Sequence, residues 1–183
     1  IYAHIADVDG DGRNELLVTA ADGIEIRRQE DLAKRGTIIP LPSCTWIHTA
    51  DINGDGRLDM IVSRYQDGES FNCDSAVFWN SEEGYSLDRV TWLATSGAMG
   101  CTAGDLDGDG DVDIMSCEME GIRGEAGPRW YIWENIDGKG ADWREHVILD
   151  ANLGGHEAVV GDVTGNGRLD VIAKPWRAAE DNA

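Results

Sequence analysis

The chain has 183 residues, of which 42% are hydrophobic and 27% charged, a balance typical of a globular domain rather than a disordered one. Its formal net charge of −20, from 35 acidic and 15 basic residues, argues against nucleic acid as a partner. No stretch approaches the roughly 20 apolar residues of a membrane-spanning helix, so membrane insertion is not expected. The 23 glycines favour many short strands joined by tight turns.

The first predicted element is a strand over residues 2–6, and an acidic, glycine-rich loop follows it. This segment, loop one, runs from Asp7 to Glu15 and leads into an apolar run. The same pattern returns as loop two (Asp51–Asp59), loop three (Asp105–Asp113) and loop four (Asp162–Asp170). Small and apolar residues precede each copy and apolar residues follow it. This self-similarity predicts one structural unit repeated along the chain.

The order of residues within each loop indicates a cation site. Oxygen donors at positions 1, 3 and 5 converge if the backbone curls tightly, and glycines at positions 4 and 6 permit that curl. A backbone carbonyl at position 7 and a carboxylate at position 9 complete a shell that suits calcium better than magnesium. The expected ligands are Asp7, Asp9, Asp11, Arg13 and Glu15; Asp51, Asn53, Asp55, Arg57 and Asp59; Asp105, Asp107, Asp109, Asp111 and Asp113; and Asp162, Thr164, Asn166, Arg168 and Asp170, where Arg13, Arg57, Asp111 and Arg168 offer their carbonyl oxygens.

Two other interpretations of the loops are weaker. Asp-Gly runs also form plain hairpin turns, but four copies in register, each with an acid at position 9, disfavour that explanation. An EF-hand needs a Glu at position 12 and flanking helices, whereas position 12 here is Val18, Val62, Ser116 and Ala173. At the side-chain ligand positions 1, 3, 5 and 9, loops one and three carry four carboxylates, loop two three and loop four two. We therefore expect loop four to lose its ion first as calcium falls.

Between the loops the sequence supplies further pairs of strands. They are predicted at 23–28 and 37–41, at 75–79 and 89–93, and at 130–134 and 145–149. Four antiparallel strands per repeat predict an all-β fold, a β-propeller of four-stranded blades. The expected division is blade 1 at about 1–42, blade 2 at about 43–95, blade 3 at about 96–150 and half of blade 4 at about 151–183. Three and a half blades indicate a partial propeller, either a fragment of a longer one or a ring completed by two chains, and we favour the fragment.

Large and reactive side chains between the loops have ordinary explanations. Trp79, Trp92, Trp133 and Trp143 are expected to pack between blades, with an aromatic platform for sugar as the alternative. The four cysteines, Cys44, Cys73, Cys101 and Cys117, lack CxxC spacing, so zinc is not expected. One or two disulfide bridges and buried free thiols both remain open.

The four loops resemble the FG-GAP/VCBS repeats of integrin α-subunit propellers and of many secreted bacterial proteins. Residues 76–86 are similar to the third-strand hairpin of the bacterial branch, and residues 155–162 are similar to it as well. The resemblance implies a propeller with one calcium per blade, bound between the first and second strands. Thr164 and Asn166 depart from the pattern. The literal Phe-Gly and Gly-Ala-Pro signatures are absent, so integrin-like ligand binding is not implied.

Two classes of function follow. The first is a calcium-stabilised binding or scaffold module that is secreted, periplasmic or on the cell surface and takes a protein or glycan ligand. Because similar propellers occur in polysaccharide lyases and a sugar dehydratase, the alternative is an enzyme domain whose catalytic candidates are His4, His48 and His156, the last beside Glu157. The other interpretation of these histidines is that they are strand residues near the central funnel, satisfied by hydrogen bonds. A purely structural repeat beside a catalytic domain is a third interpretation.

Overall fold

A computed structural model describes residues 1–119, 129–150 and 155–175. Over these ranges the chain forms fourteen strands and one 3-10 turn, η1 (Gln29–Asp31). Residues 151–154 and 176–183, which the expected half blade includes, lie outside the described residues. In the part of the chain that is described, no helix has the length and apolar character needed to cross a membrane.

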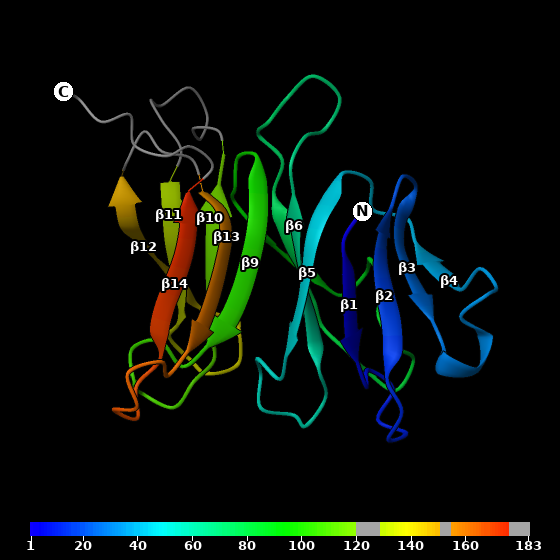
Figure 1. The fold of residues 1–183 in the computed structure, drawn as a ribbon, viewed down its shortest axis with the longest axis horizontal. Coiled ribbons are helices and arrows are strands. Elements are labelled where there is room, and N and C mark those ends of the chain that lie inside the picture. The colour runs from blue at the N-terminus through cyan, green and yellow to red at the C-terminus, as the bar shows by residue number, and fades with distance from the viewer. Residues whose placement is uncertain (120–128, 151–154, 176–183) are drawn as a thin grey trace.

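The strands form four antiparallel sheets that follow one another along the chain (Figure 1). Sheet one holds β1 (Ala3–Ala6), β2 (Glu15–Ala20), β3 (Gly23–Arg27) and β4 (Thr37–Ile39), and sheet two holds β5 (Cys44–Ala50), β6 (Asp59–Arg64), β7 (Ser75–Phe78) and β8 (Val90–Leu93). Sheet three holds β9 (Ala98–Gly104), β10 (Asp113–Glu118), β11 (Arg129–Asn135) and β12 (Trp143–Asp150), and β13 (Gly155–Gly161) pairs with β14 (Asp170–Pro175) in sheet four. Each sheet is a meander in which consecutive strands pair. The predicted all-β partial propeller is confirmed, and the strand ends differ from the predicted ones by one or two residues.

The first strand of every sheet lies on the inside of the array. Strand β5 lies against β1 and β9, and β9 lies against β13, so these four strands form a continuous inner wall (Figure 1). Side chains fasten neighbouring strands of this wall to each other. Thr45 donates from Oγ1 to the carbonyl of Ala98 at 2.8 Å, and the Nε2 of His4 lies 2.9 Å from the Oγ1 of Thr49.

The hydrophobic core is divided into three layers, one between each pair of neighbouring sheets. The first core joins Leu17 and Ile24 of sheet one to Met60 and other residues of sheet two. The second core joins sheets two and three, and the third joins sheets three and four. Successive residues of a strand point to opposite faces, so a strand with a sheet on each side is buried along its whole length, as β6 and β10 are. Strand β2, which has a neighbouring sheet on one side, alternates between buried and half-buried residues.

Of the four tryptophans that were expected to pack between blades, three do so. Trp133 is buried in the second core, and Trp79 and Trp143 pack against that core. For Trp92 the prediction is wrong, since its side chain is 46% exposed and the guanidinium of Arg64 lies 5.9 Å from its ring centroid. Trp92 lies on β8, the outermost strand, where sheets that radiate from a common axis diverge and leave the side chain uncovered.

All four cysteines are free thiols. Cys73, Cys101 and Cys117 are buried and Cys44 is half-buried. Burial raises the pKa of Cys44, Cys101 and Cys117 to about 12. Of the two alternatives left open by the sequence, the structure therefore has free thiols rather than bridges, and burial disfavours their reactive thiolate form.

Candidate metal loops

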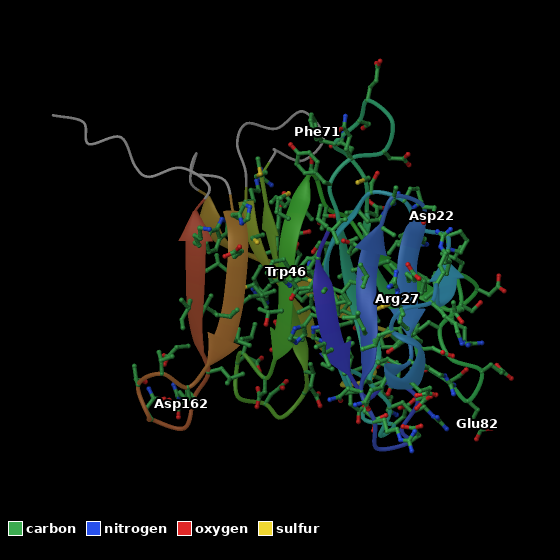
Figure 2. All side chains as sticks on the ribbon, turned by 45° about the vertical axis from the view of Figure 1, so that its right-hand side comes forward. Asp22, Arg27, Trp46, Phe71, Glu82 and Asp162 are labelled. Carbon is green, nitrogen blue, oxygen red and sulfur yellow. The ribbon has the colours of Figure 1, made fainter. Side chains whose placement is uncertain are left out.

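Each acidic loop connects the inner strand of a sheet to its second strand. Loop one follows β1, loop two follows β5, loop three follows β9 and loop four follows β13. All four loops lie at the same end of the molecule, the lower edge in Figure 1, and Asp162 marks this end in Figure 2. The repeat in the sequence thus becomes a row of equivalent loops along one face.

The glycines at positions 4 and 6 adopt the conformation that the tight curl requires. In loop one, Gly10 has φ of 75° and Gly12 has φ of 85°. The corresponding pairs in the other three loops also have positive φ. A side chain rarely adopts these angles, so the spacing of glycine in the motif has a backbone cause.

Three hydrogen bonds recur in every loop and fix its shape. The N–H of the position-6 glycine donates to the aspartate at position 1 over 2.8–3.2 Å. The N–H of position 7 donates to the side-chain oxygen of position 5 over 2.8–2.9 Å. The N–H of position 2 donates to the carboxylate of position 9 over 2.9–3.1 Å. These bonds turn the side-chain oxygens inward and leave each carboxylate with further lone pairs for a cation.

In loops one and three the carboxylates converge. Positions 1, 3 and 9 (Asp7, Asp9 and Glu15; Asp105, Asp107 and Asp113) offer ligand atoms that all lie within 4.8 Å of one another. Two oxygens on opposite sides of a calcium ion are about 5 Å apart, given Ca–O distances of roughly 2.3–2.6 Å. The residues present therefore fit a calcium ion. The position-5 residues Asp11 and Asp109 lie outside these two groups of three.

Loops two and four bring fewer acids together. Asn53 and Thr164 stand at position 3, and among the described residues neither loop forms a group of three acidic, histidine or cysteine ligands. In loop two the amide of Asn53 still faces the site region, because its Oδ1 accepts the N–H of Asp55 at 2.9 Å. Loop four is the most exposed of the four. Of its ligand positions only position 9, Asp170, is half-buried, and the others are exposed.

The position-9 carboxylates of loops one to three are buried. Glu15 is 4% exposed, Asp59 0% and Asp113 1%. Burial raises the pKa of all three above the ordinary carboxyl value, and that of Asp59 to about 6, although backbone N–H groups oppose the shift. A cation bound in the loop would offset the cost of burying these negative charges.

In loop four the carboxylate with a shifted pKa stands at position 1 rather than at position 9. The N–H of Gly167 and its neighbours lower the pKa of Asp162, which lies at the surface. Backbone hydrogen bonds thus stabilise the ionised form of that carboxylate, and water screens its charge.

Sequence reasoning missed three residues next to the loops, two asparagines and one arginine. Asn80 follows β7 and donates its backbone N–H to Asp59 at 2.9 Å, and Asn135 at the end of β11 donates to Asp113 at the same distance. Both side chains are buried. The available signal was an asparagine at the end of the third strand in two successive repeats. Arg28 was also missed, and its Nη2 pairs with the Oδ2 of Asp9 at 3.1 Å.

The histidine candidates lie on the inner wall, not at the loops. The rings of His4 and His48 are 5.8 Å apart, and burial lowers the pKa of both, that of His48 to about 4. Both rings are thus neutral at neutral pH. His156, on β13, pairs through Nδ1 with Oε1 of Glu157 at 3.3 Å. The structure brings His4 and His48 together and places His156 with its neighbour in sequence.

A groove of about 640 Å³ opens beside loop one. It lies between the segment around η1 in sheet one and the hairpin of sheet two, and its lining includes Asp9, Glu15, Arg28, Lys34, Glu83 and Tyr85. The groove thus combines charges of both signs with one aromatic ring, next to a candidate cation site.

The sequence of the chain was compared with known proteins and protein families. No curated protein matches the chain. Residues 7–62 match the sequence profile described as the FG-GAP-like repeat. The matched segment runs from the first residue of loop one through loop two and into β6, so it contains two of the four loops. This part of the chain, residues 7–62, is therefore similar to an FG-GAP-like repeat.

Proposed function

We propose that the protein is a calcium-binding propeller module of a secreted or cell-surface protein, in which each ion stabilises one blade. The observation that carries this proposal is the convergence of three carboxylates within 4.8 Å in loops one and three. The equivalent backbone geometry of loops two and four supports extending it to all four loops. Extracellular calcium, near millimolar, suits sites of modest affinity built on exposed loops.

The residues of each loop have distinct roles in this proposal. Side-chain oxygens at positions 1, 3, 5 and 9 and the carbonyl at position 7 hold the ion. The glycines at positions 4 and 6 hold the curl, and the recurring hydrogen bonds turn the oxygens toward the ion. Calcium supplies positive charge between carboxylates that otherwise repel one another. Because position 9 begins the second strand, the ion also joins the first strand of the sheet to the second.

The test is calcium binding measured together with stability. Titration calorimetry should show calcium binding, and calcium should raise the midpoint of thermal unfolding relative to the protein in chelator. At a free calcium concentration of 100 times Kd, one site contributes about 2.7 kcal/mol. The double variant Asp105→Asn/Asp107→Asn should lose one binding event and part of the calcium-dependent stabilisation.

The matched control for these substitutions is Asp31→Asn. Asp31 is exposed on η1 and pairs with Lys34, so the variant removes one carboxylate without touching a loop. It should bind calcium as the parent does. Absence of calcium binding by the parent, or unchanged binding by Asp105→Asn/Asp107→Asn, would overturn the proposal.

The ligand of the module is proposed to be a protein or glycan that binds the loop-bearing end, where the groove beside loop one lies. The mixed charges and Tyr85 of the groove support a polar ligand. A glycan array probed with calcium and with chelator tests this. Calcium-dependent binding without turnover is the expected outcome. Formation of an unsaturated product that absorbs in the ultraviolet would instead indicate the lyase alternative.

A further inference from the structure

The side-chain amide and the backbone N–H of Asn80 are all hydrogen-bonded at the junction of sheets one and two. Its Nδ2 donates to the carbonyl of Val8 at 2.8 Å and to the carbonyl of Leu58 at 3.0 Å. Its Oδ1 accepts the N–H of Ser81, and its backbone N–H donates to Asp59. Val8 is position 2 of loop one, whereas Leu58 and Asp59 are positions 8 and 9 of loop two. One buried amide therefore contacts two neighbouring metal loops.

Asn135 repeats this arrangement one sheet further on. Its Nδ2 donates to the carbonyl of Ile52 at 3.1 Å and to that of Val112 at 3.3 Å. Its Oδ1 accepts the N–H of Gly140, and its backbone N–H donates to Asp113. Ile52 is position 2 of loop two, and Val112 and Asp113 are positions 8 and 9 of loop three. The same contacts at the same loop positions show a repeated device.

The two asparagines complete a chain of hydrogen-bonded residues across three sheets. Val8 donates its N–H to the carboxylate of its own loop, Glu15, and its carbonyl accepts from Asn80. Ile52 makes the equivalent pair of bonds, to Asp59 and from Asn135. The chain runs in order through Glu15, Val8, Asn80, Asp59, Ile52, Asn135, Asp113 and Leu106. It thus links the position-9 carboxylates of loops one, two and three.

We propose that Asn80 and Asn135 couple neighbouring metal loops, so that a cation bound in one loop raises the affinity of the next. The inference rests on the proposed calcium function. A cation in loop two holds Asp59, Asp59 holds the backbone of Asn80, and the amide of Asn80 holds the carbonyl of Val8 in loop one. The next ion then meets a loop that is already ordered. By linkage the effect is equal in both directions.

A purely structural role for the two asparagines predicts something different. Each amide donates to two carbonyl groups at the junction of two sheets, and losing these hydrogen bonds costs stability whether or not calcium is present. In that case the calcium affinity of loop one would not depend on whether loop two is filled. Coupling between loops is therefore the property that separates the two roles.

The test is a calcium titration of the full chain labelled with ¹⁵N-glycine and followed by NMR. The N–H groups of Gly12 and Gly56 each donate to the position-1 aspartate of their own loop, so their resonances report loops one and two separately. Loop two is disabled by Asp51→Asn/Asp55→Asn. In the parent this change should weaken calcium binding at loop one about fivefold. In the Asn80→Ala background, disabling loop two should no longer alter calcium binding at loop one.

Asn135→Ala is the matched control, because it removes an equally buried amide with equivalent contacts. It should preserve the fivefold effect of loop two on loop one and abolish the coupling of loop two to loop three. If circular dichroism shows that Asn80→Ala does not fold, Asn80→Ser takes its place, because the short serine hydroxyl cannot reach both carbonyls.

Three outcomes would overturn the coupling. Independent affinities of loops one and two in the parent would overturn it while leaving calcium binding intact. An equal loss at all loops from Asn80→Ala and Asn135→Ala would assign the asparagines a structural role only. No calcium-dependent shift at Gly12 or Gly56 would overturn both this inference and the proposed function.

Discussion

Loops two and four share their backbone hydrogen bonds but differ in their surroundings. At position 2, Ile52 of loop two is 1% exposed in the second core, whereas Val163 of loop four is 63% exposed. At position 9, Asp59 is fully buried and Asp170 is half-buried. Sheet three covers loop two, and no described sheet follows loop four. The nine residues of the motif therefore determine the curl of a loop, and the next sheet determines its burial.

The largest expected effect tests burial at position 2. Ile52→Ala should lower the free energy of unfolding by about 2–5 kcal/mol, because it leaves a cavity between sheets two and three. Val163→Ala, at the same loop position but in contact with water, should change it by no more than about 0.5 kcal/mol. Urea unfolding followed by tryptophan fluorescence measures both. Equal effects would mean that the two surroundings do not differ energetically.

The second prediction concerns a carboxyl group on a strand that has a sheet on each side. Glu118 on β10 is 0% exposed, its Oε1 accepts the N–H of Ser96 at 2.7 Å, and burial raises its pKa to about 8. Between about pH 4.5 and 8 the folded state holds a proton that the unfolded state has lost. Stability contributed by this proton is present at low pH and falls as pH rises, by at most about 1.4 kcal/mol per pH unit.

Glu118→Gln should remove that dependence, so the variant gains stability relative to the parent as pH rises from 5 to 8. Urea unfolding at pH 5, 6.5 and 8 in chelator measures the slope. Glu30→Gln, on the exposed turn η1, is the control and should keep the slope of the parent. A parent and a Glu118→Gln variant with parallel pH profiles would show that Glu118 is ionised in the folded protein.

The third prediction ranks the loops by affinity. At ligand positions 1, 3, 5 and 9, loop four has two carboxylates and loop three has four. Loop four should therefore bind calcium about tenfold more weakly, a difference of about 1.4 kcal/mol. Chelator titration followed at the position-6 glycines Gly167 and Gly110 should show loop four emptying first. Simultaneous loss from both loops would contradict the ranking by carboxylate count.

The smallest expected effect separates ligand charge from surroundings. Thr164→Asp adds a carboxylate at position 3 of loop four and should strengthen calcium binding there about fivefold. Asn53→Asp makes the matching change in the covered loop two and should strengthen its binding as well. If Asn53→Asp improves affinity and Thr164→Asp does not, burial rather than carboxylate number limits loop four.

The sequence predicted those features that depend on neighbouring residues. The apolar runs that flank each loop and the position of glycine within it are local, so the strands and the curl of the loops follow from short segments. The buried asparagines could not be predicted in the same way, because Asn80 meets a carbonyl 72 positions away and Asn135 one 83 positions away. The exposure of Trp92 was missed for a related reason, since it depends on how sheets diverge with distance from the axis.

The rate at which the buried thiols are alkylated reports motion in the folded protein. Cys101 and Cys117 lie on adjacent strands of sheet three, and their raised pKa values keep them protonated at neutral pH. An alkylating reagent can reach them only when the sheets separate, so the rate of labelling reports how often the layers around sheet three open. Cys101 and Cys117 thus serve as natural chemical probes of local opening around sheet three, and no cysteine needs to be engineered.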